Sequence, residues 1–263
     1  MNTATAARPS LSTDHPVVSA DRWLAERKAL LAREKELVRQ SDEIARARRD
    51  LPWERVEKDY LFDALEGRRS LAELFEGRRQ LIVQHFMFGP GWEQGCPSCS
   101  YMADHADGMT VHLAARDVSF VAVSRASLAE IERFRQRMGW KFRWVSSFAN
   151  DFNKDFHVSF DPEDRVGGEV DYNYGRTPFP GSEAPGISVF CKDDAGDIFH
   201  TYSTFGRGVE AMMGTYRMLD LVPQGRNEHN ALHTMDWVRH HDRYEPQAAK
   251  PAPVAGSCCH AKA

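Results

Sequence analysis

Apolar residues in the first part of the chain recur with a helical period. Residues 19–49 contain no glycine or proline and are rich in good helix formers, and Ser19 is suited to cap the first turn. Pairs of apolar residues return every seven positions, at Trp23-Leu24, Leu30-Leu31, Leu37-Val38 and Ile44-Ala45. This spacing predicts one long helix with a single buried stripe. Because Arg27, Glu34 and Ser41 occupy the positions that would complete a coiled-coil seam, we expect a docking arm and not a zipper.

After residue 51 the pattern changes to short apolar runs that alternate with amphipathic segments. Two capping boxes, at residues 70–73 and 127–130, indicate a brief helical turn and a helix that stops at Gly139. A further helix is predicted over residues 97–115. Strands are predicted at residues 60–62, 81–88, 118–123 and 143–146. This alternation is typical of an α/β fold.

The last third of the chain is predicted to contain a loop, a hairpin and two helices. Residues 161–186 are rich in Gly, Pro, Asp and Asn and indicate a long loop of the kind that often shapes sites. Apolar runs at 187–191 and 198–203 flank a turn sequence and predict a hairpin. Helices are expected near residues 208–219 and 230–240.

These patterns divide the chain into four regions. Residues 1–18 are expected to form a disordered tail and residues 19–50 a helical arm. Residues 51–245 are expected to form the folded domain, and residues 246–263 a flexible Ala/Pro-rich tail that carries a Cys-Cys-His sequence. With 263 residues, the chain is long enough to bury one sizeable core.

Composition and charge argue against several classes of partner. The formal net charge of -4 gives no electrostatic reason to bind nucleic acid or an anionic membrane. The longest apolar run, residues 80–92, is interrupted by polar residues, Gly89 and Pro90 and is too short to span a bilayer. Residues 1–14 lack the apolar core of a secretory signal, so a cytoplasmic location is expected.

The sequence Cys96-Pro97-Ser98-Cys99 is the clearest chemical feature. The five cysteines of the chain are too few for a structural disulfide framework, which leaves catalysis or metal binding. Two thiols separated by two residues can close a small disulfide ring when a helix begins at the first one. Unpaired N–H groups at the helix start favour the thiolate of the leading cysteine. We therefore expect Cys96 to be the nucleophile and Cys99 the resolving thiol, with an incidental pair or half of a zinc site as the alternative.

A second group of thiols lies near the end of the chain, at Cys258 and Cys259, followed by His260. These residues can be oxidation-prone side chains of a disordered end, ligands for a soft metal ion, or auxiliary thiols that pass electrons to the dithiol. As a flexible tether, residues 246–258 would reach roughly 20 Å. Contact with Cys96 is therefore sterically possible.

The order of strand, dithiol helix, strand, helix, hairpin and final helix resembles that of thioredoxins. In this resemblance Ala184-Pro185 stands before the first hairpin strand, which implies a cis Pro185 that faces the dithiol and a backbone that pairs with an extended substrate. Three blocks, HFMFGPGWEQGCPSCS, WVSSFANDFNKDF and MDWVRHHDRY, are similar to the thioredoxin-like domain of unknown function 899 family over about residues 20–245. That family implies a dithiol-disulfide oxidoreductase with no assigned substrate.

The chain departs from ordinary thioredoxins around the dithiol. Gly95 replaces the tryptophan that usually precedes the first cysteine, and we expect Trp92 to cover the site instead. Gln84 or His85 occupies the place of a buried carboxylate, and His85 is expected to be a core histidine. Peroxiredoxins have a Pro and a Thr or Ser at the positions of Gly89 and Glu93, so a peroxidase is the weaker prediction.

For one further cysteine and three histidines, we expect no role in catalysis or metal binding. Cys191 follows an apolar strand and is expected to be inert. His105, His240 and His241 are expected to be solvated.

The sequence thus predicts an α/β protein with a thioredoxin-like mixed sheet flanked by helices, an N-terminal helical extension and a flexible C-terminal tail. We predict a cytoplasmic dithiol-disulfide oxidoreductase that needs no cofactor or metal. Its partners would be a disulfide-containing protein or small molecule and a reductant. The alternatives are a soft-metal-binding protein that uses the dithiol and the Cys-Cys-His tail, or a non-catalytic interaction module. The N-terminal helix could also mediate homo-oligomer formation.

Overall fold

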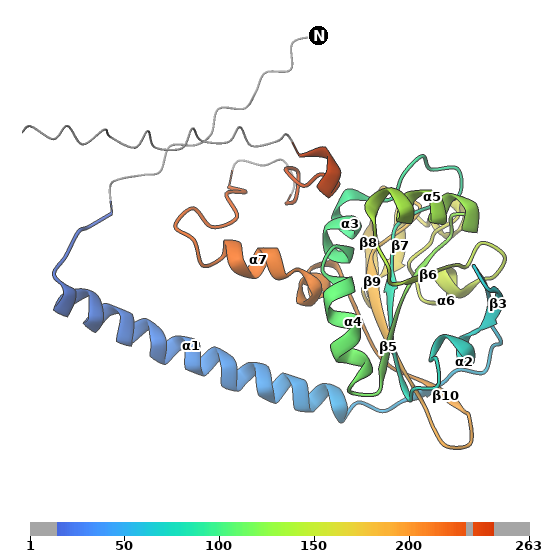
Figure 1. Cartoon of the computed structure of the whole chain (residues 1–263), viewed down its shortest axis with the longest axis horizontal. Helices are drawn as coiled ribbons and strands as arrows, with labels where there is room; N and C mark the ends of the chain where they lie inside the picture. The colour runs from blue at the N-terminus through green and yellow to red at the C-terminus, as the bar shows by residue number, and fades with distance from the viewer. Residues whose placement is uncertain (1–14, 230–233, 245–263) are drawn as a thin grey trace, which may run out of the picture.

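The computed structural model describes residues 15–229 and 234–244. Within these residues, eight strands form one mixed sheet in the order β1-β10-β9-β4-β5-β6-β2-β3 (Figure 1). Its strands are β1 (Glu54–Arg55), β2 (Leu61–Ala64), β3 (Gly67–Ser70), β4 (Gln80–His85), β5 (Val118–Ser124), β6 (Arg143–Ser146), β9 (Gly186–Lys192) and β10 (Ile198–Phe205). Two further strands, β7 (Glu169–Tyr172) and β8 (Gly175–Pro178), pair with each other in a separate sheet. β4, β5 and β6 are parallel, whereas β9 pairs antiparallel with both β4 and β10.

Helices cover both faces of the sheet. The α-helices are α1 (Ala20–Arg49), α2 (Leu71–Leu74), α3 (Pro97–Ala103), α4 (Ala106–Ala114), α5 (Leu128–Met138), α6 (Phe152–Asp155) and α7 (Gly214–Leu219), and the 3-10 helices are η1 (Pro162–Asp164), η2 (Gly206–Met212) and η3 (His241–Arg243). Residues of α3, α4, α5, η2 and α7 share one apolar core, and residues of α2 and α6 share the other. Leu81 and Val83 of β4 point into the second core, and Ile82 packs on the first, as the two-residue period of a strand requires.

Several predicted elements are confirmed. Both capping boxes form, at Ser70 before α2 and at Ser127 before α5, and Gly139 ends α5 in the left-handed conformation with φ 70°. β6 spans the predicted residues, and β9 and β10 form the predicted hairpin. Within the described part of the chain, no helix combines the length and apolar character needed to cross a bilayer.

The predicted helix over residues 97–115 is wrong in its continuity, because it is interrupted at residues 104 and 105, between α3 and α4. The His105 ring donates from Nδ1 to the Tyr101 carbonyl oxygen at 2.9 Å, and the N–H of Thr215 donates to His105 Nε2 at 3.1 Å. The side chain of His105 thereby takes the acceptor that its own backbone N–H would use in a continuous helix. His105 is a structural contact between α3 and α7 and not a solvated residue.

Three further predictions are wrong in the second half of the chain. The expected loop over residues 161–186 contains the β7-β8 hairpin, which packs through Val170 and Tyr172 on a small separate core. The region predicted as a helix near 208–219 is the 3-10 helix η2 followed by α7. The described part of the other predicted helix, residues 234–240, forms turns and irregular backbone.

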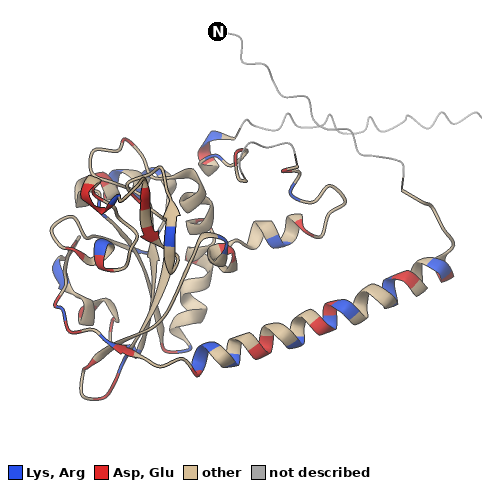
Figure 2. Cartoon of the chain, turned by 180° about the vertical axis from the view of Figure 1, so that it is seen from behind, with Lys and Arg blue, Asp and Glu red and all other residues tan. Residues whose placement is uncertain are grey.

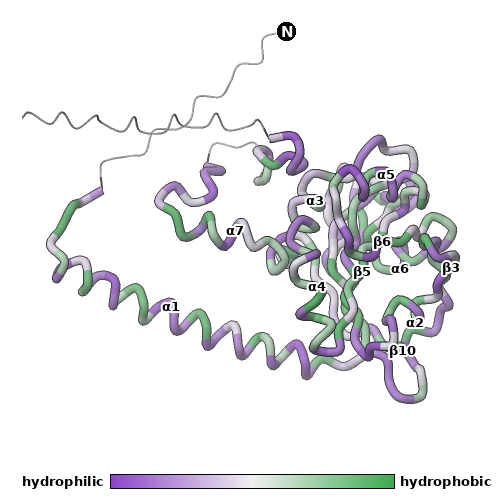
Figure 3. The backbone as a smooth tube through the Cα atoms, viewed as in Figure 1, coloured by the Kyte–Doolittle hydropathy of each residue, from purple (hydrophilic) through white to green (hydrophobic). Residues whose placement is uncertain are grey.

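The N-terminal helix is present, but its predicted buried stripe is not. α1 leads away from the sheet (Figure 1) and has no buried residue. Charges of both signs alternate along it (Figure 2), and hydrophobic residues recur between them (Figure 3). Leu37, for example, is 66% exposed. Near its C-terminal end, the Arg48 guanidinium lies over the Tyr202 ring of β10 at 5.4 Å.

Candidate active site

The dithiol lies where the chain enters α3 after the loop that follows β4. The Cys96 N–H donates to the Met87 carbonyl oxygen at 3.0 Å, and the Cys96 carbonyl oxygen accepts from the Ser100 N–H and hydroxyl, each at 2.9 Å. Cys96 occupies the N-cap position and Pro97 the first helical position, where a missing N–H costs nothing. These contacts fix the Cys96 backbone at the start of α3, as the sequence predicted.

Gly95 is required by packing. A Cβ atom at this position would lie 2.5 Å from Phe86 Cε1 and 2.9 Å from Phe134 Cε1. Both rings belong to the core on this face of the sheet, so neither is free to move aside. The residue before Cys96 therefore has no side chain because two core rings fill its space.

Cys96 and Cys99 are free thiols, and each shifts the pKa of the other. The Cys99 thiol donates a hydrogen bond to the Cys96 sulfur and, as the largest cause, lowers the pKa of Cys96 to about 7. The backbone N–H groups of Ser98 and Cys99 act in the same direction, against the effect of burial. The same hydrogen bond, together with burial, raises the pKa of Cys99. One sulfur is thus favoured as a thiolate and the other as a thiol.

Neighbouring polar groups hold Cys99 in place. The Met87 N–H donates to Cys99 Sγ at 3.5 Å, and Gln84 Nε2 donates to the Cys99 carbonyl oxygen at 3.2 Å. Gln84 is therefore the residue of β4 on the dithiol side. His85 points to the opposite face, where Nε2 lies 2.8 Å from Ser188 Oγ, and burial lowers its pKa to about 3. The prediction that His85 is a core histidine is confirmed.

A cavity of about 1090 Å³ opens beside the dithiol. Cys96, Ser98 and Cys99 line one side of it, and Pro185 lines it as well. The Ala184–Pro185 peptide bond is trans, so the expected cis bond is wrong. Ala184 is buried in the core beneath β7 and β8 and does not line the cavity.

Tyr172 holds the Pro185 segment beside the sulfurs. Its hydroxyl donates to the Pro185 carbonyl oxygen at 2.7 Å and accepts from the Gly206 N–H at 3.0 Å. The Pro185 carbonyl is therefore already bonded within the protein. Since Tyr172 lies in the hairpin that the sequence analysis treated as a loop, this contact could not be predicted.

Trp92 does not cover the cavity as predicted. Its indole packs against Gly89, where a Cβ would lie 2.9 Å from Trp92 Nε1, and it joins the apolar core around Phe86. Trp92 is not among the residues that line the cavity. The opposite wall comes from Gly206 through α7 to His229, and from Thr234 and Met235.

A buried carboxyl group precedes Ala184. Glu183 is 1% exposed, accepts a hydrogen bond from Ser159 Oγ at 2.5 Å and lies 3.6 Å from Arg125. Burial is the main cause that raises the pKa of Glu183, to about 7. This carboxyl group lies two residues before Pro185, which lines the cavity.

His240 is a further residue of the site, with a role that the sequence did not indicate. Its Nε2 donates to the Gly95 carbonyl oxygen at 2.9 Å, immediately before Cys96, and the side chain is 2% exposed. The next two residues are also held: His241 contacts Asp104 at 2.6 Å, and Asp242 pairs with Arg137 at 2.8 Å. The C-terminal segment of the described chain is thereby anchored over the entrance to α3, and the expectation that His240 is solvated is wrong.

Among the described residues, the one other thiol is Cys191, which does not line the dithiol cavity. Cys191 is half-buried on β9, and burial raises its pKa, consistent with an inert thiol. The predicted auxiliary thiols Cys258 and Cys259 lie outside the described residues. Over residues 15–229 and 234–244, no group of three or more His, Cys, Asp and Glu side chains is arranged to hold a metal ion.

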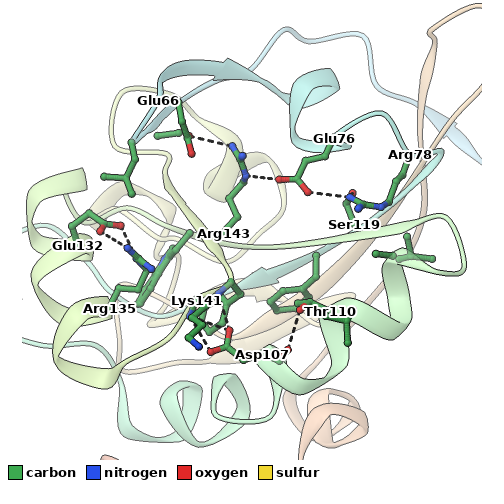
Figure 4. Close-up of a pocket in the computed structure, with 18 residues that line it drawn as sticks. Glu66, Glu76, Arg78, Asp107, Thr110, Ser119, Glu132, Arg135, Lys141 and Arg143 are labelled. Carbon is green, nitrogen blue, oxygen red and sulfur yellow. Dashed lines mark hydrogen bonds and ion pairs between the residues drawn. The ribbon is translucent and has the colours of Figure 1, made fainter.

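A second cavity, of about 530 Å³, is lined by residues of α4, α5, β5 and β6 and contains no cysteine. Figure 4 shows that its charged side chains face one another. Arg143 pairs with Glu76 at 2.8 Å and with Glu66 at 3.4 Å, and Arg135 pairs with Glu132 at 2.8 Å. The charged side chains of this cavity are thus paired with one another within the protein. We therefore take the dithiol cavity as the candidate active site.

The comparison with protein families agrees with the resemblance noted in the sequence. The model of the family described as "Bacterial protein of unknown function (DUF899)" matches residues 12–244. The chain belongs to this family. A comparison of the DUF899 chain with curated proteins found no match.

Solved structures similar to this DUF899 chain include peroxiredoxins. Peroxidoxin BcpB from Mycobacterium tuberculosis is 14% identical, with 64% of this chain and 97% of that chain covered and a TM-score of 0.42. Peroxiredoxin Q from Xanthomonas campestris is 11% identical, with 64% and 98% covered and a TM-score of 0.43. The hypothetical protein SMc02350 from Sinorhizobium meliloti 1021 is 12% identical, with 56% and 68% covered and a TM-score of 0.35.

Proposed function

We propose that this protein is a dithiol-disulfide oxidoreductase that works through Cys96 and Cys99 in a reducing compartment such as the cytoplasm. One observation carries the proposal. Cys96, whose pKa is lowered to about 7, lines an accessible cavity and accepts a hydrogen bond from the thiol that would resolve its adduct. A thiolate near neutral pH with an adjacent thiol is what exchange requires.

The reaction proceeds in two exchanges. The Cys96 thiolate attacks one sulfur of a substrate disulfide, so that a mixed disulfide forms and the first substrate thiolate leaves. The first substrate thiolate then takes up the proton of Cys99. The neighbouring Gln84 cannot do so, because it is an amide and not a base. The Cys99 thiolate attacks Cys96 Sγ, the intramolecular disulfide forms and the second substrate thiolate leaves. Two electrons pass from the dithiol to the substrate, and an external thiol reductant restores the dithiol.

Trapping the mixed disulfide tests this proposal. The reduced full-length protein is mixed with bis(2-hydroxyethyl) disulfide, and intact mass and peptide mapping identify the products. The wild type should end with a Cys96–Cys99 disulfide, and Cys99→Ser should retain a mercaptoethanol adduct on Cys96. Cys96→Ser should form neither product, and Cys191→Ser, the matched thiol control, should behave as the wild type. If Cys99→Ser never holds an adduct on Cys96, the proposal is wrong.

A further inference from the structure

The cavity beside the dithiol has the size of a small-molecule site. Its volume is about 1090 Å³, and pockets for small ligands are commonly on the order of 300–1000 Å³. Cys96 and Cys99 lie on one wall, and residues of η2, α7 and the segment after α7 lie on the other. A substrate must therefore enter a hollow to reach the Cys96 sulfur, which a disulfide on the surface of a folded protein does less readily than a small molecule.

The wall around the sulfurs is mainly apolar. Its apolar side chains come from the loop after β4, from α3, from the segment after β8 and from the region that follows β10: Met87, Met102, Phe179, Val209, Met213 and Met235. Methionine side chains are unbranched and polarizable, and they adapt to ligands of different shape. Such a wall favours an apolar body next to the disulfide.

The charged side chains that line the cavity are paired with one another. Arg226 bonds to Asp220 at 2.8 Å and to Glu210 at 3.1 Å, and Arg207 bonds to Glu210 at 2.7 Å. Both guanidinium groups are thus occupied by carboxylates of the protein itself. A substrate carboxylate would have to compete with these pairs, so the lining disfavours anionic substrates.

Glu228 adds a further carboxylate to the lining and stabilises the wall that lies opposite Cys96 and Cys99. Its Oε1 accepts hydrogen bonds from the Tyr216 hydroxyl at 2.7 Å, the Met235 N–H at 3.0 Å and Trp237 Nε1 at 2.7 Å. Three donors converge on one oxygen atom, which holds Met235 against the cavity. Among the described lining residues, the carboxylates Glu210, Asp220 and Glu228 outnumber the guanidinium groups of Arg207 and Arg226.

We infer that the substrate of this site is a low-molecular-weight disulfide whose sulfur atoms carry uncharged, apolar groups. This inference rests on the proposed function and specifies its substrate class. The apolar groups contact the methionine-rich wall, and the disulfide lies against Cys96. One substrate disulfide and the Cys96–Cys99 dithiol give two substrate thiols and the Cys96–Cys99 disulfide, so that electrons and protons balance.

Two disulfides that differ in charge but share the same groups next to sulfur test the inference. Dimethyl 4,4′-dithiodibutanoate is neutral, and its diacid carries two carboxylates. Each is mixed with the reduced full-length protein in a single turnover, and oxidation of Cys96 is followed by quenching and mass spectrometry. Each rate constant is divided by that for dithiothreitol, which removes the intrinsic reactivity of the disulfide. We expect the ester to react faster than the diacid by about tenfold.

Matched variants locate the preference in the cavity. Met235→Glu places a further carboxylate in the lining and should lower the rate for the ester by about tenfold. Met218→Glu is the control, because Met218 is 61% exposed on α7 and does not line the cavity. It adds the same charge to the protein and should leave the rates for the ester and for the diacid unchanged.

The outcomes separate the substrate class from the chemistry. Equal rates for ester and diacid in the wild type, equal effects of the two glutamate substitutions, or faster oxidation by insulin than by the ester would overturn the inference and leave thiol-disulfide exchange intact. If Cys96 reacts with none of these disulfides, the proposed function fails and the inference with it. The comparison of ester and diacid needs no variant, so it holds even if Met235→Glu does not fold.

Discussion

Replacing Cys99 with alanine should raise the pKa of Cys96 to that of an ordinary thiol. The hydrogen bond from the Cys99 thiol is the largest cause of the lowered pKa, and burial acts against it. Alanine removes the donor and leaves the backbone of α3 unchanged, because alanine is a good helix former. The substitution therefore isolates the contribution of one sulfur to the ionisation of the other.

The expected size follows from the pKa of Cys96, which falls from 9.0 to about 7. A difference of this size favours the thiolate by roughly 3 kcal/mol. If the pKa of the variant is about 8.5, its thiolate fraction at neutral pH drops from about one half to a few per cent. The more basic thiolate is also more nucleophilic, which offsets part of the loss and leaves alkylation about threefold slower near pH 7. Above about pH 9, Cys96 is ionised in both proteins, and the variant should react about fourfold faster than the wild type.

The assay is the rate of iodoacetamide alkylation at Cys96 between about pH 5 and pH 10, read from the Cys96 peptide by mass spectrometry. The rate profiles of wild type and Cys99→Ala should cross. Cys99→Ser is the matched variant, because its hydroxyl keeps a donor at the same position and should give an intermediate midpoint. A Cys99→Ala profile with the midpoint of the wild type would falsify the assignment of the hydrogen bond as the main cause.

Four further predictions test other parts of the structure. Gly95→Ala should cost about 1–3 kcal/mol in urea unfolding, because the new Cβ meets the Phe86 ring; an unchanged midpoint would contradict that contact. Leu37→Lys on α1 should change stability by less than about 0.5 kcal/mol, because the side chain is exposed; a larger loss, or a change in mass by light scattering, would reveal a second copy on this helix. Since the pKa of Glu183 is raised to about 7, its contribution to stability falls as pH rises from about 4.5 to 7, so Glu183→Gln should be relatively more stable at pH 8 than at pH 5; the opposite trend in thermal unfolding would refute this. Removing residues after Ala255 should slow recycling of the dithiol by an external thiol if the terminal cysteines are auxiliary thiols; unchanged turnover would exclude that role.

Elements whose signals lie within a few residues could be predicted from the sequence. The capping boxes before α2 and α5 and the left-handed Gly139 depend on contacts between near neighbours, and each forms as expected. The start of α3 at the dithiol is local in the same way, because Pro97 and the two-residue spacing act within one helical turn. Such signals keep their meaning whatever the rest of the chain does.

Elements that depend on distant partners could not be predicted. The interruption between α3 and α4 involves Thr215, which is 110 residues from His105. The β7-β8 hairpin has few apolar residues and is stabilised by packing against Phe160 and Phe205. The α1 pattern indicates a helix correctly, yet the pattern alone cannot say whether any surface of the same chain covers its apolar positions.

The sequence by itself determined which atoms can do chemistry here, namely two thiols at the start of a helix that follows a buried strand. Only the tertiary structure decided their environment. It placed His240 against Gly95 from 145 residues away, set the Tyr172 hydroxyl on the Pro185 carbonyl, moved Trp92 out of the site and enclosed Cys96 in a methionine-lined cavity. The physical reason is that reactivity and selectivity depend on burial and on hydrogen bonds between residues far apart along the chain, and these exist only once the layers have packed.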